Sequence, residues 1–441
     1  MRTLVRPSRP RLDALAGPAG RTAYLAGVGG VGMRGLATFL LENDWEVWGA
    51  DRKPPGLGDP LLLAGLRLIE EGAPPPPVSL AVRSAAVPAA QAGLRAACAA
   101  GARPLRYAEV LGEISRLRPV LAVAGSHGKT TCTGWIAYGL RKSGIDAGYL
   151  VGANVTQLGG SAAWGDPAAP LVLESCEYER GFFHLSPAAV ALTNVDAEHP
   201  DTYPGGLPEV QAAFREFLGR VQPADRGGQV FASPEAPDFA ASTRAEWVAA
   251  EALEPGVQVG LHGAHNRRNA ALVGAVLRGL GLDELQVGGA LLGYRGAARR
   301  MEVLGHCRGA RVVSDYAHHP AEIAATLQAA QERWPQQRIL AIFQPHQAQR
   351  FRAYRDRFAA SLQGVDALLL LEIHRARDPE DLQPSVVELL PLLASAPGQP
   401  VHPAANFDEA EEWVRAWVRP GDVVLCMGAG SVDELARRLA G

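Results

Sequence analysis

A glycine-rich turn that carries a lysine is the strongest sign of chemistry in this sequence. Gly125-Ser126-His127-Gly128-Lys129-Thr130-Thr131 follows an apolar run and precedes a helical stretch. Backbone N–H groups at a helix start, helped by the helix dipole, attract phosphate. We therefore predict a phosphate loop in which Lys129 reaches the β- and γ-phosphates of ATP. Thr130 or Thr131 would place a hydroxyl on Mg²⁺.

The loop is shorter than the strict phosphate-loop pattern, because Val123 stands where that pattern has its first glycine. A glycine-rich turn with an incidental lysine is the alternative. The chain has only three lysines, Lys53, Lys129 and Lys142, and uses arginine elsewhere. Arginine cannot copy a compact ammonium on a flexible stem. The retained lysine therefore favours the functional interpretation.

Two strand ends with polar residues follow the loop. The run Leu171–Leu173 leads into Glu174, and Ala189–Thr193 leads into a segment that contains His199. Ligands bind at the carboxyl ends of parallel strands. We expect Glu174 and His199 to face the crevice of the phosphate loop and to hold Mg²⁺ or Mn²⁺. Taken singly, each is also an ordinary polar loop residue.

A second glycine-rich turn lies near the N-terminus. It contains Gly27, Gly29, Gly30 and Gly32, and Asp51 ends the next strand. This pattern is typical of nicotinamide-dinucleotide sites. However, such a turn lets the backbone approach any pyrophosphate, and the carboxylate can bond any ribose. Because another nucleotide site follows at once, we predict a pyrophosphate site here, for a sugar nucleotide such as a UDP-sugar rather than for NAD, with Ser84 as a further expected contact.

Three later clusters carry weaker signals. His265, Asn266 and Asn269 open a helical stretch and offer groups for a base edge. Asp315 and Tyr316 precede His318-His319-Pro320, where paired histidines suggest a metal but a helix-starting proline also explains the turn. His346 and Arg350 follow a strand and could steady a carboxylate or phosphoryl oxygen.

Short apolar strands alternate with helices throughout, which predicts an α/β fold of parallel sheets covered on both faces. We expect strands at Thr22–Ala26, Glu46–Ala50, Val120–Ala124, Leu171–Leu173, Val190–Thr193, Val312–Asp315, Ile339–Phe343, Ala367–Leu371 and Val423–Met427, and helices at Phe351–Leu362 and Ala410–Val418. The predicted parts are a disordered extension at 1–20 and three α/β domains at 21–115, 116–298 and 299–441.

Composition excludes several classes of protein. The net charge is -3 and no basic block marks a nucleic-acid partner. No apolar run reaches the roughly 20 residues needed to span a membrane. The five cysteines are widely spaced and form no CxxC pair, which indicates a reducing compartment. We expect a cytoplasmic protein.

The order of these motifs resembles the Mur ligases, which build the peptide of bacterial cell-wall precursors. The resemblance runs from Thr22 to Gly441. It rests on Gly27–Gly32 with Met33, Ser126–Thr131, Thr193–His199, His265-Asn266, Arg299–Glu302, Asp315–Pro320 with Glu322-Ile323, and Phe343–His346.

The resemblance implies three domains. The N-terminal domain (21–115) would be Rossmann-like and bind the UDP-sugar, the central domain (116–298) would be P-loop ATPase-like and bind ATP and Mg²⁺, and the C-terminal ligase domain (299–441) would be Rossmann-like. It implies that Lys129 and Thr130 contact ATP phosphates within the loop Gly125–Thr131. Thr131, Glu174 and His199 would hold Mg²⁺. His265, Asn266 and Asn269 would contact adenine, and Asp315 the ribose. Tyr316, His346 and Arg350 would lie on the amino-acid side, and the catalytic groups would be Lys129, His199, His346 and Arg350.

Within the family, the sequence is most similar to the alanine-adding branch. That branch joins L-alanine to the carboxylate of UDP-N-acetylmuramic acid through an acyl phosphate and uses ATP. Sibling ligases use a carbamylated lysine in the middle domain, and here no lysine follows Lys142. We expect a monomer or weak homodimer.

Alternatives remain open. A muropeptide-recycling ligase attaches a tripeptide instead, and Glu177-Tyr178 and Phe182-Phe183 slightly favour it. An NAD-dependent oxidoreductase would leave Lys129 unexplained, and a non-catalytic homologue would leave Lys129, Glu174 and His199 unexplained. The sequence also departs from the family's usual Glu-Ala-Asp-Glu-Ser run, which here reads Glu174-Ser175-Cys176-Glu177-Tyr178.

Overall fold

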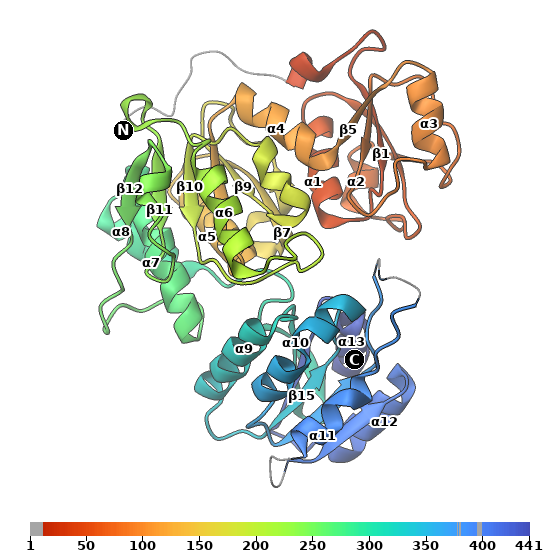
Figure 1. The fold of residues 1–441 in the computed structure, drawn as a ribbon, viewed down its shortest axis with the longest axis vertical. Coiled ribbons are helices and arrows are strands. Elements are labelled where there is room, and N and C mark those ends of the chain that lie inside the picture. Colours follow the sequence, from red (N-terminus) through yellow and green to blue (C-terminus); the bar gives the residue numbers. More distant parts are fainter. Residues whose placement is uncertain (1–11, 377, 379–380, 395–398) are drawn as a thin grey trace. The chain divides into compact units, whose positions relative to one another are not determined.

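The computed structural model describes residues 12–376, 378, 381–394 and 399–441. The chain forms two compact units (Figure 1). The first unit comprises Met1–Ala197, Leu207–Gln258 and Arg268–Tyr294, and the second comprises Glu198–Gly206, Val259–Arg267 and Arg295–Gly441. Each unit is described separately below.

The first sheet of the first unit is a five-stranded parallel sheet. In spatial order its strands are β3 (Arg67–Leu68), β2 (Glu46–Ala50), β1 (Thr22–Ala26), β4 (Leu80–Arg83) and β5 (Arg103–Arg106). Its helices are α1 (Val31–Leu41), α2 (Pro60–Leu63), α3 (Ala92–Ala99) and α4 (Tyr107–Leu117). The strand order reverses beside β1, where doubly wound sheets bind their ligands. The turn after β1 is therefore at the expected position for a nucleotide.

The second sheet of the first unit has seven strands. In spatial order they are β12 (Glu246–Ala249), β11 (Gln229–Ala232), β10 (Ala189–Leu192), β6 (Val120–Ala124), β9 (Leu171–Glu174), β7 (Gly148–Val155) and β8 (Gly160–Ala163). The helices are α5 (Lys129–Lys142), α6 (Leu207–Leu218), α7 (Ala264–Gly279) and α8 (Glu284–Gly293). All five residues of β6 are buried, as a continuous apolar strand in a covered parallel sheet must be. The loop after β6 lies between the ends of β9 and β10.

Helix α1 joins the two sheets of the first unit. Its Phe39 ring lies edge-on to Trp164, with ring centroids 5.3 Å apart, and the Trp164 backbone N–H donates to Glu42 over 2.6 Å. Gly35 sits against Leu150 and Ala162, where a β-carbon would come within 3.1 Å of the Leu150 side chain. This close approach fixes the two sheets in one body.

The second unit contains a six-stranded sheet. In spatial order its strands are β13 (Glu302–Cys307), β14 (Ala310–Asp315), β18 (Val423–Met427), β15 (Ile339–Phe343), β16 (Ala367–Leu371) and β17 (Val401–Ala404). Its helices are α9 (Pro320–Arg333), α10 (Ala348–Ser361), α11 (Leu390–Leu393), α12 (Phe407–Trp417) and α13 (Val432–Ala440). One core cluster packs Ile323 and Phe351 on one face of the sheet, and another packs Val414 and Leu435 on the other.

The α/β class and the predicted strands are confirmed. Two antiparallel pairs, β7 with β8 and β13 with β14, were not predicted. Residues 12–20, expected as part of a disordered extension, include a short 3-10 helix at Leu12–Leu15 whose two leucines are buried, while residues 1–11 lie outside the described residues. The boundary predicted between residues 115 and 116 falls inside α4. Among the described residues, no helix is long and apolar enough to cross a membrane.

Candidate active site

The loop between β6 and α5 has the backbone of a phosphate loop. Gly128 is the N-cap of α5 with φ of 81°, and Gly125 has φ of 139°. A β-carbon on Gly125 would lie 1.9 Å from the Thr193 hydroxyl, so no side chain fits there. The first N–H groups of α5 therefore face a turn lined by glycines, which leaves room for an anion.

Asn194, two residues after β10, hydrogen-bonds to this loop through both its side chain and its backbone. Its side-chain oxygen accepts from the His127 N–H over 3.0 Å, and its side-chain amide donates to the His127 carbonyl over 3.1 Å. Its backbone carbonyl accepts from the Ser126 N–H over 2.9 Å. Sequence reasoning missed this residue, although it follows the strand end that was singled out.

Lys129 forms an ion pair with Glu177. The two oxygens of Glu177 lie 2.9 and 3.2 Å from Lys129 Nζ, and the Glu177 side chain is fully buried. The ammonium also donates to the carbonyls of Gly125 and Ser126. Burial alone would lower the pKa of Lys129, but the Glu177 carboxylate outweighs it and raises the pKa above its usual range. The ion pair with Glu177 thus favours the charged form of Lys129 at the loop.

Glu174 and Thr130 form the second polar pair at the loop. The Thr130 hydroxyl donates to Glu174 Oε1 over 2.9 Å, and the Gly152 N–H donates to Oε2 over 2.6 Å. A carboxylate and a hydroxyl supply the oxygen ligands that Mg²⁺ prefers, so the pair fits a divalent cation. The threonine within reach of Glu174 is Thr130, whereas the family resemblance had assigned Thr131 to the metal.

The residues expected around adenine divide between the two units. Asn269 is buried in the first unit, and a β-carbon on Gly128 would lie 2.8 Å from its side-chain oxygen. Asn266, in the second unit, donates to the His262 carbonyl over 2.7 Å. The Asn269 side chain therefore lies against Gly128 of the phosphate loop. The adenine contacts of His265, Asn266 and Asn269, and the metal role of His199 in the second unit, stay predictions.

Asp51 closes the glycine-rich turn after β1. One of its oxygens accepts from the Gly29 N–H over 2.8 Å, and the other accepts from the Lys53 N–H over 2.8 Å. Ser84 lies directly beside Gly27, whose added β-carbon would meet the serine oxygen at 2.6 Å. The predicted sugar-nucleotide residues thus come together, with Asp51 shaping the turn.

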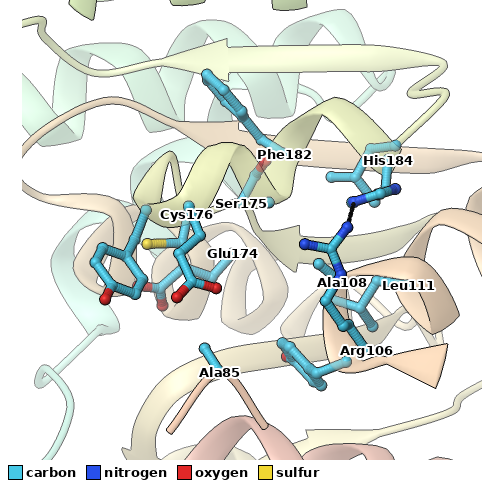
Figure 2. A pocket seen from close by; sticks show the side chains of 14 residues that line it. Ala85, Arg106, Ala108, Leu111, Glu174, Ser175, Cys176, Phe182 and His184 are labelled. Carbon is cyan, nitrogen blue, oxygen red and sulfur yellow. Dashed lines mark hydrogen bonds between the residues drawn. The ribbon is translucent and has the colours of Figure 1, made fainter. Parts of the chain in front are cut away.

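A pocket of about 140 Å³ opens between α4 and the segment after β9 (Figure 2). Its polar lining includes Arg106, Glu174, Ser175, Cys176 and His184. Its apolar lining is made by Ala85, Ala108, Leu111, Phe182 and Leu185. Because Ala85 follows Ser84 and Glu174 contacts Thr130, the pocket lies next to both the glycine-rich turn and the phosphate loop.

Arg106 and His184 form a fixed pair in this pocket. An Arg106 Nη lies 3.0 Å from His184 Nε2, and the same nitrogen donates to Glu109 over 3.2 Å. Because a guanidinium only donates, Nε2 must accept, and the ring proton of neutral His184 sits on Nδ1. Burial first, and then the Arg106 cation, lower the pKa of His184. Neither residue was predicted as a site residue.

The second unit uses Asp315 to build a turn. Its two oxygens accept from the Met301 N–H and the Ala317 N–H, both over 2.8 Å. Burial raises the pKa of Asp315, which is 4% exposed. The Arg299 guanidinium lies 4.8 Å from the centre of the Tyr316 ring, a cation–π contact. The roles of Asp315 on ribose and of Tyr316 on the amino acid stay predictions.

Arg350 forms a buried ion pair with Glu198 inside the second unit. The Nη–Oε2 distance is 3.2 Å, and both side chains are 4% exposed. His346 stacks on His374 with ring centroids 5.6 Å apart. Pro320 is the first residue of α9, so the start of this helix explains the turn after Asp315 without a metal. His346 and Arg350 lie at the ends of neighbouring elements, as the sequence predicted, while their contact with an amino acid stays a prediction.

Known proteins resemble this chain over almost its whole length. Residues 299–430 match the family model "Mur ligase, glutamate ligase domain". The UDP-N-acetylmuramate–L-alanine ligases of Chloroflexus aggregans and a Roseiflexus species are 34% and 36% identical, covering 94% and 92% of this chain and 96% of each relative. The solved UDP-N-acetylmuramate–alanine ligase of Thermotoga maritima is 23% identical, with a TM-score of 0.77, and covers 95% of this chain and 98% of that one. The murein peptide ligase of Psychrobacter arcticus gives 24% identity and a TM-score of 0.71 over the same shares.

Three α/β sheets and a phosphate loop with a paired lysine are those of a nucleotide-binding enzyme, and the matched relatives make it an ATP-dependent ligase. The two solved structures share this architecture. The chain belongs to the Mur ligase family and, within it, to the UDP-N-acetylmuramate–L-alanine ligases.

Proposed function

We propose that the chain joins the amino group of L-alanine to the carboxylate of UDP-N-acetylmuramic acid and converts ATP to ADP and phosphate. The observation that carries this proposal is the arrangement in the first unit. The glycine-rich turn at Gly29, the pocket at Arg106 and the phosphate loop at Lys129 follow one another within a single body.

The sugar nucleotide extends from the glycine-rich turn through the pocket toward the phosphate loop. Its pyrophosphate lies on the turn shaped by Asp51, and its sugar occupies the pocket. Arg106 has guanidinium donors beyond those used by His184 and Glu109, and sugar hydroxyl and carboxylate oxygens accept such donors. The sugar-linked carboxylate is then directed toward Glu174 and the phosphate loop.

A carboxylate has no leaving group, so it is activated first. The carboxylate oxygen attacks the γ-phosphorus of ATP, and ADP leaves, which gives an acyl phosphate. Lys129 neutralises charge on the transferred phosphoryl group, and Glu177 keeps the lysine oriented. Glu174 and Thr130 would hold Mg²⁺ or Mn²⁺, and the resemblance adds Thr131 and His199 as expected ligands; the ion would supply further charge neutralisation.

The alanine amine then attacks the acyl carbon, and phosphate leaves. The amine must be neutral to attack. We assign its proton to His346, because His199 cannot ligate a metal and act as a base at once. Arg350 and Tyr316 orient the alanine carboxylate. His265, Asn266 and Asn269 contact adenine, and Asp315 contacts the ribose.

Phosphate release in the presence of an amino-acid panel tests this function. Release should require ATP, UDP-N-acetylmuramic acid and L-alanine together, and Lys129→Ala is the blank. Dependence on a tripeptide in place of alanine would instead assign the muropeptide-recycling reaction. Release that needs no amino acid at all would contradict ligation.

A further inference from the structure

Tyr107 lies where the glycine-rich turn after β1 meets the sugar pocket. It lines the pocket of Figure 2, together with Arg106 and Glu174. A β-carbon on Gly32 would lie 3.0 Å from the Tyr107 hydroxyl oxygen. Gly32 is the second residue of α1, so this hydroxyl lies against the first turn of that helix. Tyr107 therefore belongs to both parts of the proposed sugar-nucleotide site.

The local fold holds the Tyr107 ring in this position. Tyr107 is the first residue of α4 and directly follows β5. Because β1, β4 and β5 are parallel, it lies at the same edge of the sheet as the turn after β1. The Arg106 N–H donates to the Glu109 carboxylate over 2.6 Å, which caps the start of α4. A side chain at position 32 would press on the phenol, and the glycine there leaves room for it.

The Tyr107 hydroxyl is a donor that the described residues do not use. The side chain is half-buried, and its hydroxyl forms no hydrogen bond with another described residue. Tyr149, in the same unit, differs because its hydroxyl donates to the Leu158 carbonyl over 2.7 Å. Burial first, and then the Glu174 carboxylate, raise the pKa of Tyr107, so the phenol keeps its proton. It can therefore donate to an anion.

The position of Tyr107 singles out one phosphate of a sugar nucleotide. Asp51, at the ribose end of the predicted site, bonds the Gly29 N–H from the side of β2. Tyr107 lies at the other end of the turn, against Gly32, and also lines the pocket proposed for the sugar. A sugar nucleotide runs from ribose through two phosphates to the sugar. A phosphate beside Tyr107 would therefore be the one bonded to the sugar, at a helix start that favours an anion.

We propose that the Tyr107 hydroxyl donates a hydrogen bond to the sugar-linked phosphate of the substrate and is a substrate-binding residue. The inference rests on the proposed function for the identity of the sugar nucleotide, but not for recognition of the phosphate. The contact fixes the point from which the sugar enters the pocket. It thereby directs the sugar-linked carboxylate toward Glu174.

Calorimetric titration with UDP and with UMP separates the two phosphates, because UMP lacks the phosphate that a sugar would carry. Both titrations contain ADP, which fills the phosphate loop. We expect Tyr107→Phe to weaken the binding of UDP at least about tenfold, as for one hydrogen bond to a charged group, and to leave the binding of UMP within about twofold. In ligation, the KM for UDP-N-acetylmuramic acid should rise by a similar factor, while kcat changes less than about threefold.

Tyr149→Phe is the matched control. It removes a hydroxyl whose partner is a protein carbonyl, so it should lower the urea midpoint of unfolding and change neither affinity. Tyr107→Phe removes a hydroxyl without a partner among the described residues, so its urea midpoint should match that of the parent. A general loosening of the first unit would weaken UDP and UMP equally, whereas the phosphate contact weakens UDP alone.

The outcomes separate the proposal from its rivals. No binding of UDP to the parent, unchanged UDP affinity in Tyr107→Phe, or equal losses for UDP and UMP would overturn it. A loss confined to UDP-N-acetylmuramic acid would overturn it too, since the hydroxyl would then contact the sugar or its carboxylate. A selective loss for UDP in a protein that ligates no amino acid would instead count against the proposed function alone.

Discussion

Glu177 lies 2.9 Å from Lys129, with its carboxylate fully buried behind the phosphate loop. The pair gives the ammonium a fixed direction, because the carbonyls of Gly125 and Ser126 accept its other protons. The lysine therefore stays charged and oriented within a buried site.

We expect Glu177→Gln to lower the free energy of unfolding by about 3 kcal/mol, because it leaves a buried ammonium without its counter-charge. The ligation rate should fall roughly a hundredfold, since Lys129 is no longer held against the phosphoryl group. Urea unfolding and phosphate release measure the two effects. Glu216→Gln, which alters an exposed pair with Arg220, is the control and should change stability by less than about 1 kcal/mol. Equal effects of the two variants would contradict this role.

Thr130 and Thr131 can be separated by matched substitutions. Thr130→Val removes the hydroxyl that bonds Glu174, so the Mg²⁺ concentration for half-maximal rate should rise about tenfold. Thr131→Val makes the same change of side chain at the next residue. It should shift the Mg²⁺ concentration for half-maximal rate much less. A magnesium titration of ligation decides between them. The reverse order would restore the assignment to Thr131 that the family resemblance implied.

The His184–Arg106 pair predicts a loss of sugar-nucleotide binding in acid. The pKa of His184 lies below its ordinary value of 6.5 in the folded chain, so the unfolded chain takes up the proton first. Its contribution to stability is therefore present above pH 6.5 and is lost as the pH falls through the lowered pKa. Protonated His184 cannot accept from Arg106, so the KM for UDP-N-acetylmuramic acid should rise on acidification while kcat changes less. Glutamine accepts at any pH, so His184→Gln should flatten this KM profile, and an unchanged profile would contradict the assignment.

The buried pair of Glu198 and Arg350 predicts acid sensitivity of the second unit. Burial alone would raise the pKa of Glu198, but Arg350 and then His319 outweigh it and lower the pKa. The stabilisation is therefore present above the ordinary glutamate pKa of 4.5 and is lost as the pH falls through the lowered value.

A double-mutant cycle measures this pair. Glu198→Gln alone should cost about 3 kcal/mol, and removing Arg350 as well should recover part of that loss. The exposed pair of Arg355 and Glu388 is the control cycle and should show a coupling below about 1 kcal/mol. Additive effects at Glu198 and Arg350 would show that the two side chains do not stabilise each other.

Much of the site could be predicted because the succession of apolar strands along the chain and the spacing of the glycines are local properties of the sequence. The phosphate loop, Glu174 and the turn at Gly29 all follow apolar strands, so the carboxyl ends of those strands identified them. Glu177 and Asn194 escaped because their importance depends on contacts with residues far along the chain, the Lys129 side chain for Glu177 and the His127 backbone for Asn194. Arg106 and His184 escaped for the same reason, since 78 residues separate them in sequence. The antiparallel β7–β8 pair also lacked a clear signal, because β7 shows no strong alternation and β8 consists of four small residues.

The contact of Gly35 with Leu150 and Ala162 makes α1 a spacer of fixed length in the first unit. The distance between the proposed pyrophosphate turn and the phosphate loop is therefore fixed by packing within the first unit. A fixed distance of this kind selects acid substrates by length, because only a molecule whose carboxylate reaches the phosphate loop can react. A bulkier residue at position 35 would push the sheets apart and change the length of molecule that can react.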